Sequence, residues 1–391
     1  MPHAYIVEAV RTAGGKRGGV LRDWHPADMA AEVLDALVDR AGIDPGAVDD
    51  VIMGCVGQAG EQAFHVGRNA VLASTLPASV PAVTIDRQCG SSQQSIQFAA
   101  QAVMSGTQDV VIAAGVESMT RVPMGLPFTL PMQHGIGTGP FSRRIQERFG
   151  VAMFSQFHGA EMIAEKYQFG RDQLDEFAFQ SHVKAARASR DGAFDAEILP
   201  LNVSGDNGET NLHGRDEGIR YDPSFKSIAS VKPLKEGGKI SAANASQICD
   251  GAAGVLVVSE GALKEHNLRP IARIHNLTVT AGDPVIMLEE PIPATARALQ
   301  RAGMTIADID LYEVNEAFAP VPLAWLRATG ADPERLNVNG GAIALGHPLG
   351  ASGAKLMTTL IHALRARGKR YGLQTMCEGG GIANVTIVEA V

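Results

Sequence analysis

The sequence predicts an α/β fold made of two similar halves, with a different segment inserted between them. Apolar runs of strand length alternate with helical patterns through much of the 391 residues, which is typical of buried, largely parallel strands joined by helices. The order of motifs found early in the chain also occurs late. Between these two parts the alternation is interrupted. We therefore expect a duplicated architecture rather than a series of unrelated units.

The early half has a regular order of strands and helices. The predicted strands are residues 5–10, 51–55, 83–85 and 110–116, and the predicted helices are residues 29–40 and 92–104. In the second helix the apolar residues Ile96, Ala99, Ala100 and Val103 recur at the spacing of one helical face. This pattern predicts that the helix is buried along one side.

The late half repeats the early one. The segments ALVDRAGIDPGAVDDVIMGCV and ALQRAGMTIADIDLYEVNEAF share Ala-Leu, an Ala-Gly helix end, a short turn, an aspartate and a strand. The strand, small-residue turn, helix and strand that follow residue 82 have a counterpart after residue 335, including a helix at 354–365 and a strand at 372–376. Any two α/β units look alike in outline, but the shared Ala-Gly and aspartate favour duplication. Equivalent loops of the two halves are then expected to face one shared site.

The middle of the chain has a different character. It opens with the Pro-, Met- and Gly-rich stretch RVPMGLPFTLPMQHGIGTGPFSRR, which favours no regular element. A helical section follows at 159–190, and residues 214–239 then carry six basic and four acidic side chains in an acidic protein. Long irregular segments in compact proteins are usually functional, so we expect a partly irregular cap over the site.

Composition excludes several classes of function. Hydrophobic residues make up 45% and charged residues 19% of the chain, which excludes wholesale disorder. With 34 basic against 42 acidic residues the net charge is −8, which argues against a nucleic-acid binder. No apolar window approaches the ~18 residues of a membrane span, and the first residues do not resemble a signal peptide. We expect a cytoplasmic protein that inserts into no membrane.

The four cysteines are too few and too scattered for a disulfide framework, and no C-x-x-C pair indicates zinc. We therefore expect no metal site and reduced thiols. Cys55 and Cys249 are interpreted as core residues. In a reducing compartment a thiol is either a small buried hydrophobe or a reagent.

Cys89 is the strongest candidate for a reagent. It follows the strand at 83–85 and directly precedes a helix whose first turn contains the small residues Gly90, Ser91 and Ser92. A thiol at a helix N-terminus faces unpaired N–H groups and the positive end of the helix dipole, which favour the thiolate. The alternative is a buried structural cysteine, but the polar flanking residues favour a nucleophile.

His347 lies in GGAIALGHPLGASGA, the loop that takes the place in the late half that Cys89 takes in the early half. The glycines there allow the backbone to approach a ligand closely. The alternatives are a turn with an incidental histidine or a phosphate cradle, but no Gly-Lys-Ser/Thr of a Walker loop follows. Among the other histidines, only His158 has flanking residues that indicate a pocket.

Cys377 ends a strand and is followed by Glu378 and three glycines, a place that packing alone does not explain. Asn315 and Glu316 end a strand in YEVNEAFA, where an ordinary helix N-cap is the simpler interpretation. Two thiols and one imidazole at such junctions indicate a nucleophile, its activator and a separate acid/base. The pKa of an unperturbed thiol is about 8.5, so a thiol is well matched to proton transfer at the carbon next to a thioester carbonyl. Acyl transfer with carbon–carbon chemistry is therefore favoured over hydrolysis.

At these residues the sequence resembles the thiolase family, and the resemblance spans essentially the whole chain. It is carried by VEAVRT, DRQCGSSQQ, GVESM, NASQICDGAA, NEAFA, GGAIALGHPLGASGA and CEGGGIA in combination. The resemblance implies a five-layered αβαβα fold from two duplicated βαβαβαββ domains plus an inserted loop domain. The implied boundaries are 1–118 with 246–265 for the N-terminal domain, 119–245 for the loop domain and 266–391 for the C-terminal domain.

The resemblance also implies roles for individual residues. Cys89 is the acyl-accepting nucleophile, His347 activates it, and Cys377 exchanges a proton with the α-carbon of the acetyl group. Asn315 would hold a water that forms one oxyanion hole with His347, and the backbone N–H groups of Cys89 and Gly379 would form the second. Coenzyme A is a substrate, and no cofactor or metal is implied.

For coenzyme A binding, Arg220 matches the family position best, and Ser227 and Ser246 match it less well. The implied reaction is reversible transfer between a 3-ketoacyl-CoA plus CoA and acetyl-CoA plus a shortened acyl-CoA. It proceeds through an acyl-cysteine with ping-pong kinetics. The resemblance leaves open a biosynthetic direction, which forms acetoacetyl-CoA, or a degradative one with longer or steroid-like chains.

Three departures from the family pattern surround the expected acyl pocket. Cys89 is followed by Gly-Ser-Ser instead of the frequent x-Ser-Gly, and residues 156–161 and the stretch near Met287 also differ. These changes argue against specificity for acetyl groups alone. Residues 122–144 differ from the family's tetramerisation loop, so a homodimer and a homotetramer are both expected possibilities.

Two other classes of function compete with this reading. A decarboxylating ketoacyl synthase would lack the second cysteine and would typically have a histidine where Asn315 stands. A non-catalytic acyl-CoA or lipid-binding homologue would need no pair of thiols.

Overall fold

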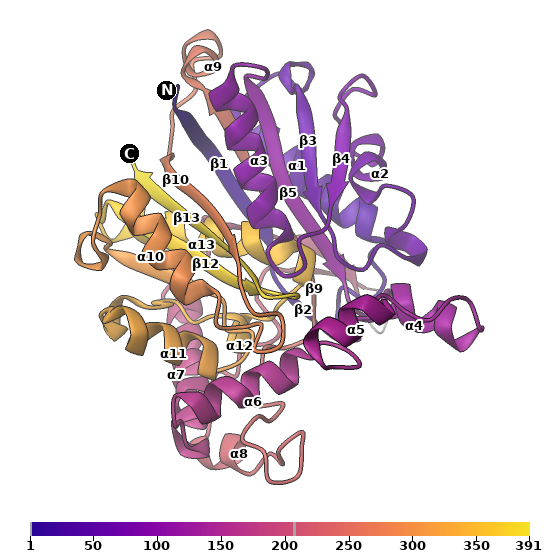
Figure 1. The fold of residues 1–391 in the computed structure, drawn as a ribbon. Helices are drawn as coiled ribbons and strands as arrows, with labels where there is room; N and C mark the ends of the chain where they lie inside the picture. The colour runs from indigo at the N-terminus through magenta and orange to yellow at the C-terminus, as the bar shows by residue number, and fades with distance from the viewer. Residues whose placement is uncertain (1, 206–208) are drawn as a thin grey trace.

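A long mixed sheet forms the centre of the molecule in the computed structural model, which describes residues 2–205 and 209–391 (Figure 1). The strand order is β11-β12-β13-β10-β1-β9-β5-β3-β4, and the short strands β2 and β6 pair with β9 and β1. The strands of this sheet are β1 (Ala4–Thr12), β2 (Gly15–Lys16), β3 (Asp50–Gly54), β4 (Ala82–Ile85), β5 (Val110–Ser118), β6 (Ile198–Leu199), β9 (Cys249–Ser259), β10 (Ala272–Ala281), β11 (Leu311–Val314), β12 (Tyr371–Glu378) and β13 (Ile382–Ala390).

The two halves of this sheet have the same topology. In the early half β1 is antiparallel to β9, β9 is antiparallel to β5, and β5 is parallel to β3. In the late half β10 is antiparallel to β13, β13 is antiparallel to β12, and β12 is parallel to β11. The halves join where β1 pairs with β10, at Tyr5 with Arg273 and Ile6 with Ala272. The predicted duplication is confirmed.

The repeated Ala-Gly motif ends equivalent helices in the two halves. Helix α1 (Pro26–Ala41) is followed by Gly42 with φ of 68°, and helix α10 (Pro291–Ala302) is followed by Gly303 with φ of 66°. Both glycines take the left-handed conformation that closes a helix, which glycine adopts without steric cost. The same local signal therefore produces the same element twice.

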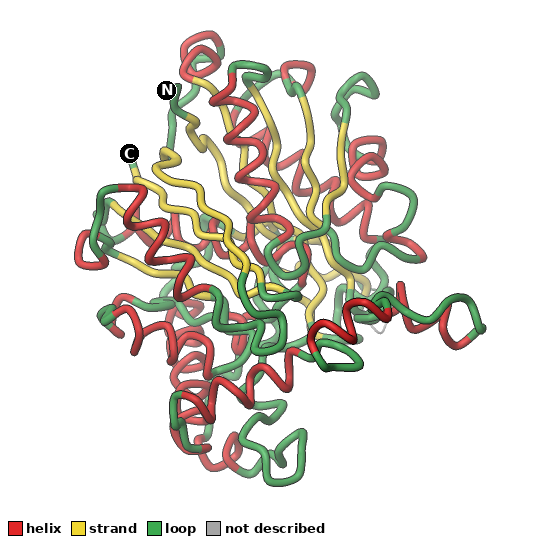
Figure 2. The backbone as a smooth tube through the Cα atoms, viewed as in Figure 1, coloured by secondary structure: helices red, strands yellow, loops and turns green. Residues whose placement is uncertain are grey.

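The layers follow from which helix contacts which half of the sheet. Helices α3 (Ser91–Ser105) and α13 (Ser352–Ala366) pack on each other and contact strands of both halves. On the outer faces, α1 with α2 (Val66–Ala73) covers the early half, and α10 with α11 (Pro320–Thr329) covers the late half. Figure 2 shows this alternation of strands and helices. The expected αβαβα order is confirmed, and it places the N-termini of α3 and α13 side by side.

The inserted segment corrects one expectation. The Pro- and Gly-rich stretch 121–144 was expected to lack regular elements, but it contains α4 (Leu126–Gln133), and α5 (Arg143–Phe149) begins at its end. Helix α4 tolerates Pro127 because the first turn of a helix needs no bond from that N–H. The helical section expected at 159–190 is two helices, α6 (Gln156–Lys166) and α7 (Arg171–Arg190), separated at Gln168, whose φ is 54°.

The remaining elements complete the chain. They are a hairpin of β7 (Leu201–Ser204) and β8 (Thr210–His213), the helices α8 (Phe225–Ala229), α9 (Glu260–Glu265) and α12 (Ala342–Leu345), and the 3-10 turns η1 (Pro45–Ala47), η2 (Gly60–Gln62), η3 (Ile306–Asp308), η4 (Pro333–Arg335) and η5 (Leu349–Ala351). Among the described residues, no helix combines the length and the apolar character needed to cross a membrane. The domain boundaries given above stay a prediction.

Candidate active site

Cys89 lies in a tight turn between β4 and α3. The preceding residue, Gln88, has a φ of 47°, a left-handed conformation that is uncommon outside glycine. Side chains hold this turn from both sides: Asp86 accepts the N–H of Gln88 at 2.6 Å, and Ser91 accepts the N–H of Arg87 at 2.9 Å. Cys89 is the one free thiol among the described cysteines that keeps partial exposure. The expected position at the start of a helix is therefore present.

The protonation state of Cys89 differs from the expectation. Burial, reinforced by the carboxylate of Glu378, raises the pKa of the Cys89 thiol to about 12. The cost of removing a thiolate from water exceeds the help from the helix N-terminus. The resting group is therefore a thiol, and a nucleophilic role requires a base to take its proton.

Cys377 lies at the end of β12, beside the Cys89 turn. It is buried and packs in a cluster that includes Met287, Phe318 and Ile343. Burial raises the pKa of the Cys377 thiol well above its usual value, and a charge on Cys89 raises it further. The charge state of Cys89 therefore affects the Cys377 thiol.

The β12 end and the Cys89 turn fit together without spare room. A Cβ on Gly90 would lie 2.0 Å from Oε1 of Glu378, and a Cβ on Gly379 would lie 2.9 Å from Oε1 of Gln88. Position 90 favours glycine, because the Glu378 carboxylate oxygen occupies the space that a Cβ would need. Gly379 accordingly lies against the turn that carries Cys89.

His347 and Asn315 form a second pair. Nε2 of His347 lies 3.3 Å from Nδ2 of Asn315, and Nδ1 lies 2.5 Å from Oγ of Ser352. Because the Ser352 hydroxyl donates to the Pro348 carbonyl at 2.9 Å, its oxygen accepts from Nδ1–H of the imidazole. This assignment leaves Nε2 unprotonated, and its lone pair accepts a hydrogen bond from Nδ2–H of Asn315. Asn315 is not a helix N-cap, since α11 begins five residues later, at Pro320.

The imidazole is neutral at ordinary pH. His347 is 4% exposed, and its burial together with the charge of Lys355 lowers its pKa to about 3. A neutral imidazole with Nε2 unprotonated is the form that acts as a base.

Contacts between the central helices bring the two pairs to one region. The N–H of Ala354 donates to Oγ of Ser92 at 2.9 Å, and a Cβ on Gly353 would lie 2.1 Å from the N atom of Gln93. The N–H of Asn315 donates to the carbonyl of Thr375 at 3.1 Å, two residues before Cys377. The starts of α3 and α13 and the ends of β11 and β12 therefore meet.

Two buried carboxylates support these loops and were missed as site residues. Glu117 accepts the N–H groups of Val56, Gly57 and Gly350, each at 2.9 Å, and so joins the two halves. Glu316 accepts from Ser181 at 2.7 Å and from the N–H of Ile343 at 3.1 Å. The only available signal was their position, since each follows an apolar strand in GVESM or YEVNEAF.

The candidate coenzyme A residues are spread over the surface. Arg220 and Ser227 lie exposed on the inserted segment, and the backbone N–H of Arg220 donates to Nδ1 of His182 at 3.3 Å. Ser246 is half-buried, and its N–H donates to the carbonyl of Ala317 at 2.9 Å. Ser246 is linked to the His347 turn through the next residue in the chain: the backbone carbonyl of Gln247 accepts the N–H of His347 at 3.0 Å.

A cavity of about 470 Å³ lies on the inserted segment. Its lining residues are Ser155, Phe157, His158, Glu161, Leu234, Lys235 and Ile240. The ring of Phe157 meets that of Phe318 edge to face, with 5.4 Å between centroids, and Phe318 packs in the same cluster as Cys377. The cavity is within the usual size range of small-molecule sites, about 300–1,000 Å³. Residues 156–161, which depart from the family pattern, supply part of its wall.

In the part of the chain that the structure describes, no group of three or more His, Cys, Asp and Glu side chains is arranged to hold a metal ion. The candidate site residues are two thiols, an imidazole and an amide at the ends of strands and the starts of helices.

Comparisons with known proteins find one family over nearly the whole chain. The family described as thiolase, N-terminal domain, matches residues 4–261, and the family described as thiolase, C-terminal domain, matches residues 268–390. A steroid 3-ketoacyl-CoA thiolase, FadA6, of Mycobacterium tuberculosis is 52% identical and aligns over 100% of this chain and 94% of its own length. A 3-ketoacyl-CoA thiolase of Pectobacterium carotovorum is 40% identical over 100% of both chains. The crystal structure of the Bacillus anthracis acetyl-CoA acetyltransferase has a TM-score of 0.91, with 36% identity, and the match covers 100% of this chain and 99% of that one.

Proposed function

This chain belongs to the thiolase family and is an acyltransferase, and we propose that it cleaves 3-ketoacyl-CoA thioesters with bulky acyl groups by means of Cys89, His347, Cys377, Asn315 and Gly379. The observation that carries the assignment of residues is the protonation pattern. Two protonated thiols, Cys89 and Cys377, accompany an imidazole whose Nε2 is unprotonated and can therefore act as a base.

The first half-reaction cleaves the carbon–carbon bond. His347 takes the Cys89 proton, and the sulfur attacks the 3-keto carbon while the N–H groups of Cys89 and Gly379 stabilise the oxyanion. The bond between C2 and C3 breaks, the acyl group stays on Cys89, and acetyl-CoA leaves as an enolate. Asn315 and His347 stabilise the enolate oxygen, and Cys377 protonates its carbon. Oδ1 of Asn315 is buried without a hydrogen-bond partner in the described part of the chain, which fits an amide that holds a water.

The second half-reaction releases the acyl group. The thiol of CoA gives its proton to Cys377, and its sulfur attacks the acyl group on Cys89. Cys89 then leaves and recovers its proton from His347. These steps use protein side chains and CoA as a substrate. For CoA we propose contacts with Arg220, Ser227 and Ser246, which lie on or next to the inserted segment.

The bulky substrate class is supported by two observations. The 52% identical relative is named a steroid 3-ketoacyl-CoA thiolase. The cavity of about 470 Å³ has the apolar side chains Phe157, Leu234 and Ile240 in its wall, and residues 156–161 differ from the common family pattern. The second candidate is a biosynthetic enzyme that condenses two acetyl-CoA molecules, which the likeness to an acetyl-CoA acetyltransferase favours.

Thiolysis rates distinguish the two candidates. We expect kcat/KM to be higher for a polycyclic 3-ketoacyl-CoA than for acetoacetyl-CoA, and Phe157→Ala to lower the polycyclic rate more than the acetoacetyl rate. Phe128→Ala is a matched control, because Phe128 is an exposed phenylalanine of α4 that is not among the lining residues of the cavity. Equal or higher kcat/KM for acetoacetyl-CoA would favour the biosynthetic candidate.

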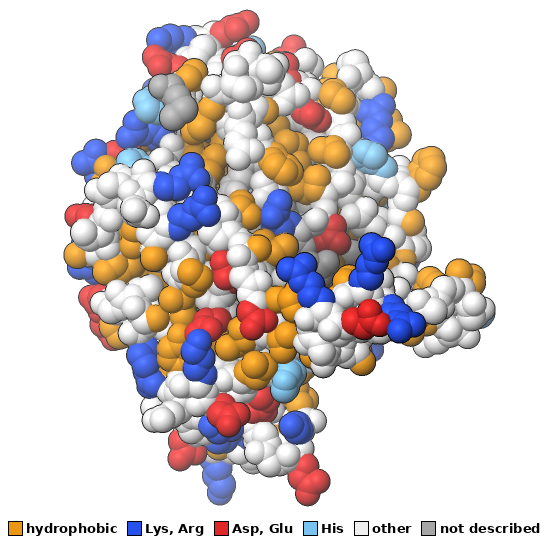
Figure 3. Space-filling model, in the orientation of Figure 1, with side chains coloured by type: hydrophobic (Ala, Val, Ile, Leu, Met, Phe, Trp, Pro, Cys, Tyr) orange, Lys and Arg blue, Asp and Glu red, His pale blue; other side chains and the backbone are white. Residues whose placement is uncertain are grey.

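We further propose a homodimer through the outer edge of the early half. Strand β4 is the last strand of the sheet and pairs only with β3 among the described strands. The apolar residues Phe64, Leu72, Val83 and Phe98 on or near this edge are exposed, and Phe64 is 94% exposed. Hydrophobic side chains gather over α3 and α2 on this face (Figure 3). An unpaired edge with apolar neighbours is a typical place for a second copy. Val83→Lys should shift the protein toward a monomer in light scattering, whereas an unchanged mass would exclude this interface.

A further inference from the structure

The backbone turn before His347 is held by groups from outside its own segment. The Gln247 carbonyl accepts the N–H of His347 at 3.0 Å, and the Gln247 side chain donates to the Ile343 carbonyl at 2.7 Å. Between these contacts, Nζ of Lys355 donates to the Leu345 carbonyl at 2.5 Å. Three separate hydrogen bonds therefore fix the backbone turn that carries His347.

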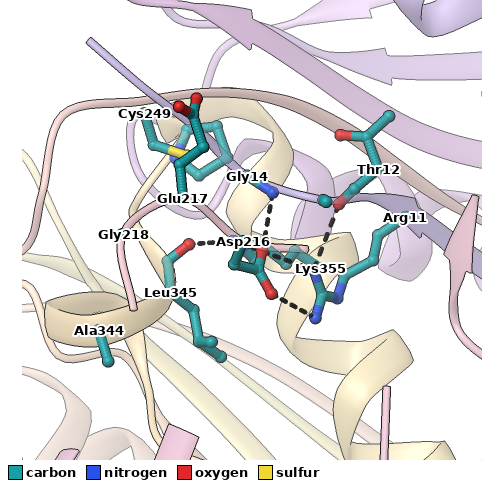
Figure 4. Close-up of polar contacts among 12 residues, drawn as sticks. Arg11, Thr12, Gly14, Asp216, Glu217, Gly218, Cys249, Ala344, Leu345 and Lys355 are labelled. Atoms are coloured by element: carbon teal, nitrogen blue, oxygen red, sulfur yellow. Dashed lines mark hydrogen bonds and ion pairs between the residues drawn. The ribbon is translucent and has the colours of Figure 1, made fainter. Parts of the chain in front are cut away.

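Lys355 is itself fixed by a buried carboxylate. It is 5% exposed, and Nζ lies 3.6 Å from Oδ1 of Asp216. Asp216 also accepts from both terminal nitrogens of Arg11, at 2.8 and 3.1 Å, and from the N–H of Gly14 at 2.7 Å. Figure 4 shows Asp216 between Arg11, Gly14 and Lys355.

We call Arg11, Asp216, Lys355 and the Leu345 carbonyl the brace. Its members come from the end of β1, from the inserted segment and from the late half. A buried ion pair is weak evidence for a stabilising role, because well-packed apolar residues in its place often stabilise the folded state equally well. Stability alone therefore does not explain why a lysine lies here. What distinguishes this lysine is its partner, a carbonyl two residues before the imidazole.

We propose that Lys355 is a positioning residue, which holds the Leu345–His347 turn so that Nε2 of His347 faces Asn315. The proposal rests on the proposed role of His347 as the base. Flexibility of this turn would move the ring relative to the Cys89 thiol, and loss of groups that orient a site residue typically costs about 10–100-fold in activity.

The charge of Lys355 also acts on the imidazole. The groups around the ring are Lys355 and Ser352 from α13, Asn315 after β11, and the Cys249 thiol of β9, which borders Gly346. Asp216 forms an ion pair with Lys355, and Arg11 forms an ion pair with Asp216. Removal of the lysine charge should therefore raise the pKa of His347 toward its ordinary value, although burial, the larger cause of the lowering, remains.

Three substitutions separate positioning from simple stability. Lys355→Met removes both the donor and the charge, Lys355→Gln removes the charge but keeps an N–H donor, and Lys355→Arg keeps the charge. Thr358→Val is the matched control on α13, because Thr358 is buried and its hydroxyl has no hydrogen-bond partner in the described part of the chain. Melting temperatures are measured for all variants.

We expect kcat of Lys355→Met to fall about 10–100-fold while KM for CoA stays within about twofold, as removal of a transition-state interaction predicts. The acid limb of its pH profile should move to higher pH. Lys355→Arg should recover most of the loss and Lys355→Gln part of it. If Lys355→Met does not fold, the other two variants test the proposal. A higher kcat for Lys355→Arg than for Lys355→Gln supports the positioning role, and equal kcat values overturn it.

The proposal is overturned if Lys355→Met has the kcat of Thr358→Val, if KM alone changes, or if the Arg and Gln variants do not differ. His347→Ala is measured in parallel. If His347→Ala remains active, the proposed function fails; if it is inactive while Lys355→Met is not, only the positioning role fails.

Discussion

Nδ1 of His347 lies 2.5 Å from Oγ of Ser352, whose own hydrogen is used by the Pro348 carbonyl. This contact selects the tautomer in which Nε2 carries no proton. The serine is the first residue of α13, so the helix start that orients the loop also sets the chemistry of the ring. The relationship links the central helix of the fold directly to the base of the proposed reaction.

The first prediction concerns this serine. Ser352→Ala leaves Nδ1–H without its acceptor, so we expect kcat to fall about 10-fold or more, in line with other groups that orient a site histidine. KM for CoA should change little. Ser95→Ala on α3 is the control, because Ser95 is also buried in a central helix but donates only to the Ser91 carbonyl. Equal kcat for the two variants would contradict the assigned tautomer.

Alkylation of Cys89 tests its protonation state. Because burial and Glu378 raise the pKa of this thiol to about 12, the rate of reaction with iodoacetamide should keep rising with pH beyond pH 9. Cys89 should still be labelled before Cys55, Cys249 and Cys377, which are buried. Removal of the neighbouring carboxylate in Glu378→Gln should raise the rate at a fixed pH. A plateau near neutral pH would show instead that the thiolate is the resting form.

Acid stability tests the buried pair of Arg11 and Asp216. Despite burial, which opposes it, the charges of Arg11 and Lys355 lower the pKa of Asp216 to about 2. A lowered pKa in the folded state adds stability above the unfolded value of about 3.9, and this stability is lost as the pH falls toward about 2. The contribution is about 2–3 kcal/mol. We expect the difference in unfolding free energy between the wild type and Asp216→Asn to shrink as the pH falls from about 4 to about 2. A difference independent of pH in this window would exclude an ionised Asp216.

Much of the architecture could be predicted from short-range patterns. The Ala-Gly helix ends, at Gly42 and Gly303, signal equivalent helices because the left-handed closing residue is a local requirement. The duplicated order then implied that the loops of Cys89 and His347 face one region, and the contacts between α3 and α13 agree. The short helix α4 was not predicted, because its two prolines, Pro127 and Pro131, look the same in sequence as prolines in a loop.

The electrostatics of the site could not be predicted in the same way. The helix N-terminus at Cys89 indicated a thiolate, yet the pKa depends on burial and on Glu378, a residue 289 positions away in sequence that follows Cys377. The partners of Asp216 likewise come from two distant segments, the one with Arg11 and Gly14 and the one with Lys355, and nothing near Asp216 in the sequence indicates them. Residue types at a junction can be read locally, whereas desolvation depends on the whole fold.

The measurement that tests the account most directly is the fate of an acetyl group in Cys377→Ala. If Cys89 accepts the acyl group and Cys377 acts only at carbon, this variant mixed with acetyl-CoA should carry an acetyl group on the Cys89 peptide in mass spectrometry, yet form no acetoacetyl-CoA. His347→Ala should acquire the group much more slowly. An acetyl group on another residue, or condensation at the wild-type rate, would contradict the division of labour between the two thiols.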